Sequence, residues 1–98
     1  MATDSVSDME LPSSKALSHA AKIGIMDDRP IMLDYWEDSL VKKVFIGIRE
    51  SGEKLLVKSE DEYTSPIHKI FKVENNYMIM TENSIYVVKA DIPNKKIS

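Results

Sequence analysis

The spacing of apolar residues in the first third of the chain is that of a helix. Between residues 14 and 24 the apolar side chains recur at intervals that place them on one face: Leu17, Ala20, Ala21 and Ile23. Ser13 or Ser14 precedes this segment as a capping residue, and Gly24 is a stop signal at its end. The pattern predicts a short helix, which needs packing against the domain or another copy because isolated helices of this length are marginal.

Beyond Pro30 the period changes to two, as expected for strands with one buried face. The segment 43–49 and the segment 54–58 flank a turn containing Gly52, and together they predict a β-hairpin. The segment 67–73 follows Pro66, and the pair Asn75-Asn76 then predicts a tight turn into the next strand. A polar stretch at 82–84 leads to a last apolar run.

Short strands joined by tight turns predict a mainly β (α+β) fold. We expect a small antiparallel β-barrel, or a curled five-stranded meander, with one short N-terminal helix; an open sheet covered by that helix is the alternative. Residues 1–13 are polar and predict a flexible tail, residues 14–92 a single small domain, and residues 93–98 a flexible C-terminus.

Two predicted strands carry apolar residues on both faces, so each face must pack against another layer of the structure. In the predicted strand 31–36, Met32 and Trp36 lie opposite the face that carries Tyr35, so either that second face is also buried or the indole is an exposed contact. In the segment 77–81, Met78 and Met80 lie opposite Ile79. The helix or a second subunit would have to supply the missing layer, and methionine suits an adaptable interface.

Composition is that of an ordinary globular domain. The 98 residues are 43 % hydrophobic and 30 % charged, and no run approaches the roughly 20 apolar residues that span a bilayer. An acidic start and the absence of cysteine predict a cytoplasmic protein without disulfides. A net charge of −3 disfavours a protein dedicated to binding phosphate backbones.

Known catalytic and metal-binding patterns are absent from the sequence. His19 and His68 are the two histidines and show no metal-ligand spacing, and the serines occur in no G-x-S-x-G motif. Three glycines are too few for a phosphate-binding loop. We therefore expect no enzyme activity, no catalytic residues, no cofactor and no metal.

The remaining signal is surface chemistry, which predicts a non-catalytic protein-protein interaction or regulatory module. We expect it to self-associate as a homo-oligomer, with a dimer the simplest form, and to bind a protein partner through aromatic and methionine side chains: Met32, Trp36, Tyr63, Met78 and Met80. An inhibitor of viral or phage origin that occludes a host protein would have this make-up.

Two alternatives remain open at this point. The first is a small barrel that binds single-stranded nucleic acid with its lysines and aromatic residues, although the acidic composition disfavours it. The second is an oligomer that holds a small ligand between its subunits.

Overall fold

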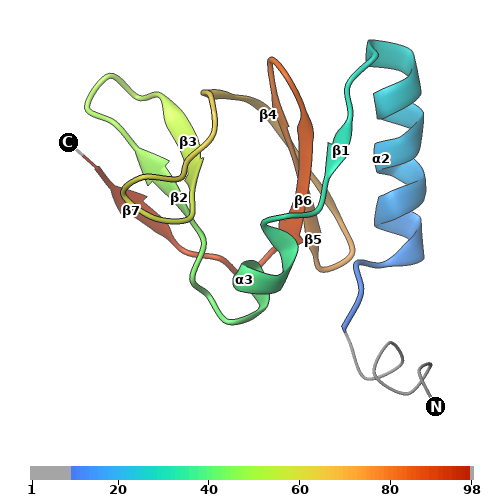
Figure 1. Ribbon diagram of the computed structural model, residues 1–98, viewed down its shortest axis with the longest axis horizontal. Coiled ribbons are helices and arrows are strands. Elements are labelled where there is room, and N and C mark those ends of the chain that lie inside the picture. The colour runs from blue at the N-terminus through green and yellow to red at the C-terminus, as the bar shows by residue number, and fades with distance from the viewer. Residues whose placement is uncertain (1–9, 98) are drawn as a thin grey trace.

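The computed structural model describes residues 10–97, which form two β-sheets and two helices (Figure 1). The elements in chain order are α2 (Ser14–Asp27), β1 (Ile31–Met32), α3 (Trp36–Leu40), β2 (Phe45–Ile48), β3 (Lys54–Val57), β4 (Ile67–Val73), β5 (Asn76–Thr81), β6 (Ile85–Lys89) and β7 (Asn94–Lys96). No helix in this part of the chain is both long and apolar enough to cross a bilayer.

The larger sheet has the strand order β1-β6-β5-β4 and the smaller sheet the order β3-β2-β7. Neighbouring strands are antiparallel except for two parallel pairs, β1 with β6 and β2 with β7. The mainly β fold with an N-terminal helix is confirmed. The described residues form two separate sheets and no closed barrel, so neither the barrel nor the five-stranded meander is confirmed.

Apart from the exposed strand β4, the larger sheet is covered on both faces, with the smaller sheet on one side and α2 on the other (Figure 1). Ile79 and Val88 point toward the smaller sheet and pack there with Ile46 and Leu56. The opposite face packs with Ala20 of α2 and consists of these side chains: Met78, Met80, Ile85 and Val87. The layer that the two-sided strand 77–81 was expected to need is therefore supplied within one chain.

Helix α2 begins where the sequence predicted, but it ends three residues later than predicted. Ser13 is the N-cap, and its Oγ accepts a hydrogen bond from the Ala16 amide at 2.9 Å. The helix continues through Gly24 and ends at Asp27, because Asp28 adopts the left-handed conformation (φ 55°) and its amide bonds the Gly24 carbonyl. Its buried face consists of alanines that allow close approach to the sheet, Ala16 and Ala20.

The expected strand 31–36 is wrong beyond Met32. Only Ile31 and Met32 pair with β6, and the chain then turns into the short helix α3. Tyr35 and Trp36 still enter opposite sides of the larger sheet, Tyr35 between the sheets and Trp36 on the α2 side. A six-residue segment with one polar residue, Asp34, is too short to distinguish a strand from a turn followed by a helix, which explains the error.

Residues near both ends of the chain contact the domain where flexible segments were expected. The predicted tail falls partly on residues 1–9, which lie outside the described residues. Glu10 accepts a hydrogen bond on its carbonyl from Trp36 Nε1 at 2.9 Å, and its carboxylate forms an ion pair with Lys89. The segment 93–98, predicted to be flexible, contains β7, which pairs in parallel with β2.

The turn between β4 and β5 lies one residue earlier than predicted. Val73 pairs with Asn76, so the turn residues are Glu74 and Asn75, and Glu74 adopts the positive φ of 56°. Asn76 is instead buried at the start of β5, where its Oδ1 accepts a hydrogen bond from the Ser13 amide at 2.7 Å. Asn76 thus joins the start of α2 to the larger sheet.

Candidate functional site: a groove on the smaller sheet

The outer face of the smaller sheet is lined by apolar side chains, of which Leu55 and Val57 are buried and Tyr63 is exposed. Residues alternate along β2, so Ile46 faces the larger sheet while Phe45 and Gly47 face outward. On β3 the partners of these two residues are Val57 and Leu55, which face outward as well. Phe45, Leu55 and Val57 line one hollow of about 350 Å³ together with Tyr63 and Ile97; we call it the groove.

Gly47 shapes the floor of the groove. A Cβ atom at this position would lie 2.8 Å from Ile97 Cδ1 and 3.0 Å from Val57 Cγ2, closer than packed carbon atoms approach. The absence of a side chain at Gly47 thus lets Ile97 lie directly on β2. Ile97 is held there by its own backbone, because its amide donates to the Ile48 carbonyl at 2.8 Å.

Tyr63 forms one wall of the groove and is held by the edge of β3. It forms an isolated antiparallel bridge with Val57. The neighbouring Thr64 is buried, donates its backbone amide to the Leu56 carbonyl at 2.9 Å, and accepts the Leu56 amide on Oγ1 at 3.1 Å. These bonds fix the backbone directly after Tyr63, and Tyr63 itself remains 53 % exposed.

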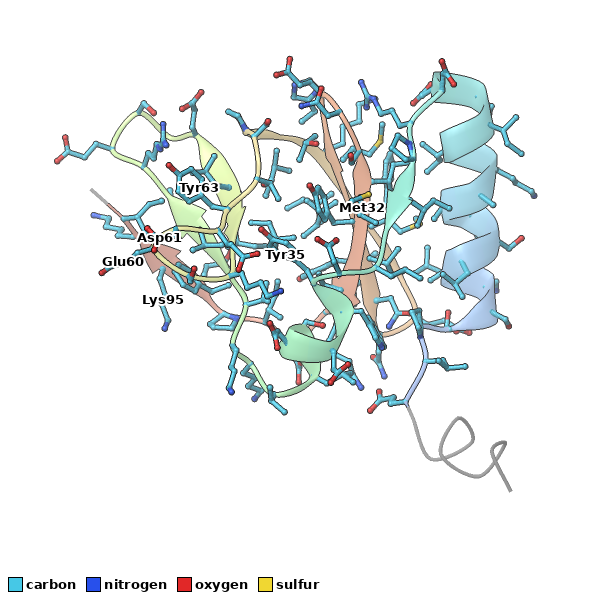
Figure 2. The ribbon with its side chains drawn as sticks, viewed as in Figure 1. Met32, Tyr35, Glu60, Asp61, Tyr63 and Lys95 are labelled. Carbon is cyan, nitrogen blue, oxygen red and sulfur yellow. The ribbon has the colours of Figure 1, made fainter. Side chains whose placement is uncertain are left out.

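Charged groups of both signs surround the groove. Arg49 and Glu60 belong to its lining, and Arg49 Nη1 lies 3.5 Å from Glu53 Oε1. Lys95 Nζ lies 4.9 Å from the centroid of the Phe45 ring, within the range of a cation-π contact. Figure 2 shows Glu60, Asp61, Tyr63 and Lys95 together over the smaller sheet, on the side of the molecule away from α2. The groove therefore has an apolar centre and a polar rim.

Two tyrosines lie between the sheets, behind the groove. Tyr35 and Tyr86 contact each other edge to face, with their ring centroids 5.3 Å apart. Burial raises the pKa of Tyr35 to about 12, with smaller contributions from Tyr86, Glu62 and Asp34. Burial also raises the pKa of Tyr86. Both phenols therefore stay neutral at physiological pH, and neither suits proton abstraction.

The five predicted partner-binding residues are not brought together. Tyr63 lines the groove. Met78 and Met80 lie beneath α2. Trp36 is only 6 % exposed, so its face is buried and the indole is not an exposed contact. Met32 is half-buried on β1 (Figure 2). The apolar surface that motivated self-association is thus largely covered within one chain; self-association itself stays a prediction.

Lysines and aromatic residues do not form one continuous strip. Lys69 and Lys72 lie on β4 of the larger sheet, whereas Lys95 and Phe45 belong to the smaller sheet. Lys58 Nζ lies 3.4 Å from Asp38 Oδ2 and 5.3 Å from the Tyr35 ring centroid. Within residues 10–97, no three His, Cys, Asp or Glu side chains gather as a metal site.

Sequence reasoning missed most of the groove. Tyr63 was identified, but nothing in the local sequence distinguishes Leu55, Val57 and Ile97 from ordinary strand or terminal residues. Their shared surface depends on β7 pairing with β2 across a long stretch of chain, and no local pattern encodes that pairing. The available signal was the segment 54–57, where two adjacent leucines precede a valine and leave no polar face.

Comparisons with known protein families, with characterised proteins and with solved structures give no significant match.

Proposed function

We propose that the protein is a non-catalytic interaction module that binds a partner protein by accepting one of its bulky apolar side chains in the groove. The observation that carries this proposal is the combination of an apolar floor, Leu55 and Val57, with an open wall formed by Tyr63. Binding sites commonly combine a mostly apolar lining with a few polar groups at the margin.

Several properties of the groove suit an anchoring contact. Tyrosine is among the residues that contribute most to interfaces, because it buries a large area with few rotatable bonds. Thr64 and the bridge to Val57 hold the backbone of Tyr63 before any partner arrives, which reduces the ordering cost of binding. The rim residues Arg49 and Glu60 would orient a partner through its charges.

The test is selection of binding peptides from a displayed random library against the full chain. Selected peptides should share a large apolar residue, and their binding should perturb the amide resonances of Phe45, Val57 and Tyr63. Tyr63→Ala should weaken binding by about fivefold or more, as for the truncation of an interface anchor that contributes over 1 kcal/mol.

Val41→Ala is the matched control, because Val41 is a similarly exposed apolar residue outside the groove. Its binding should equal that of the wild type. Peptides whose affinity is unchanged by Tyr63→Ala, or a library that yields no binder, would contradict the proposal.

A further inference from the structure

The outer edge of β4 is the longest strand edge without a neighbour in residues 10–97. This strand runs for seven residues, Ile67–Val73, and pairs with β5 on one side only. The other edge strands offer less: β1 has two residues, β7 has three, and the edge of β3 is bridged by Tyr63. Each residue of β4 is exposed or half-buried.

The backbone of this edge is arranged to accept a further strand. Val73 and Asn76 close a two-residue turn, so Val73 directs its amide and carbonyl toward β5. Because hydrogen-bonding direction alternates along an antiparallel strand, Ile70 and Lys72 direct theirs away from the sheet. A peptide that adds to the sheet would pair with these outward groups.

The side chains of β4 define what such a peptide must carry. Lys69 and Phe71 are opposite Met80 and Met78 and share the α2 side, while Ile70 and Lys72 share the other side. The strand contains two lysines and a histidine and no carboxylate, in a chain whose net charge is −3. Its edge is therefore a local basic strip with two apolar side chains at its centre.

A second copy of this chain is a poor occupant for the edge. It would bring the same lysines and no acidic residue to meet them, and like charges on neighbouring strands are destabilising. Lysines on an exposed edge are a known safeguard against such self-pairing. The same charges favour a strand of opposite sign.

We propose that the β4 edge binds an extended segment of a partner protein with the pattern acidic-apolar-apolar-acidic. The two acidic residues would lie opposite Lys69 and Lys72, and the two apolar residues opposite Ile70 and Phe71. This pattern reads the same in both directions, so it suits a parallel or an antiparallel added strand. The site belongs to the larger sheet and is independent of the groove.

A peptide fits this edge better than single-stranded nucleic acid. The outward amides and carbonyls at Ile70 and Lys72 match the alternating donors and acceptors of another peptide backbone, whereas a sugar-phosphate backbone offers no donors of that kind. Base stacking would also need several exposed aromatic rings, and β4 carries one, Phe71.

The test uses the full chain and three synthetic peptides, STEVVETS, its rearranged form STVEEVTS, and the basic form STKVVKTS. We expect STEVVETS to shift the amide resonances of β4 and β5, to slow hydrogen exchange at Ile70 and Lys72, and to bind at least about fivefold more tightly than STVEEVTS, as two favourable cross-strand charge pairs allow. Raised salt should weaken this binding.

A charge exchange separates a specific site from general attraction. The double variant Lys69→Glu, Lys72→Glu should no longer bind STEVVETS and should bind STKVVKTS instead. Lys42→Glu, Lys43→Glu makes the same charge change on an exposed turn and should retain the preference for STEVVETS. Equal binding of STEVVETS and STVEEVTS, shifts outside β4 and β5, or tighter lysine-dependent binding of oligo(dT) would overturn the proposal, the last in favour of nucleic acid.

Discussion

The larger and the smaller sheet each have apolar residues on both faces, but they are covered to different extents. In the larger sheet Ile79 packs against the smaller sheet and Met78 packs beneath α2. In the smaller sheet Ile46 is covered in the same way, whereas the opposite face has only Phe45, Tyr63 and Ile97 over its floor. Apolar residues on both faces of a strand therefore show that both faces must be covered, without showing which element covers each.

The largest difference between the sheets should appear when an isoleucine is truncated in each. Ile79→Ala removes a fully buried side chain from between the sheets and should lower the free energy of unfolding by about 2–5 kcal/mol. Ile97→Ala removes a half-buried side chain from the groove and should cost about 1 kcal/mol or less, because less apolar area is lost. Urea unfolding of both variants measures the two values; equal losses would show that the groove face is as tightly packed as the core.

A smaller effect should come from the hairpin that builds the smaller sheet. Gly52 has a φ of 93°, and no other group lies within 4 Å of a Cβ placed there. Gly52→Val should therefore cost about 1–2 kcal/mol through backbone strain alone. Glu50→Val, at an exposed position of the same turn, is the control and should change the unfolding free energy by less than about 0.5 kcal/mol. Wild-type stability of Gly52→Val would mean that the turn adjusts without strain.

The smallest effect concerns the interface between the sheets at high pH. The pKa of Tyr35 is raised to about 12 in the folded chain, so above pH 10 the unfolded chain releases this proton first. The contribution of Tyr35 to stability is complete below pH 10 and should be lost as the pH rises toward 12. Urea unfolding at pH 9 and pH 11 should show a smaller decline for Tyr35→Phe than for the wild type; identical declines would contradict this linkage.

Local patterns in the sequence predicted local structure well. The hairpin of β2 and β3, the strand β4 and the Ser13 cap all follow from residues close together in the chain, and each is present. The parallel pairs β1 with β6 and β2 with β7 were not predicted, because each joins segments whose own patterns are short and ambiguous. Within residues 10–97 the chain passes from one sheet to the other between β1 and β2, between β3 and β4 and between β6 and β7, so two sheets replace the single meander.

The candidate site was less predictable than the fold, for a related reason. Tyr63 was chosen as an aromatic residue suited to anchor an interface, and it is exposed in the groove. Trp36 was chosen because it lies opposite the face that carries Tyr35, but its ring is buried on the α2 side and its Nε1 donates to the Glu10 carbonyl. Alternation predicts the side of a strand on which a residue lies, and exposure depends on elements distant in the sequence.

The parallel pairing of β2 with β7 has a consequence for the order in which the domain assembles. Neighbouring strands such as β4, β5 and β6 close short loops and meet quickly, whereas Ile46 must find Asn94 across almost half the chain. Long loops are closed at an entropic cost before their contacts stabilise anything, which slows folding. Ile97 reaches the groove only after that closure, so the groove should be the last surface to form and the first to be lost in local unfolding.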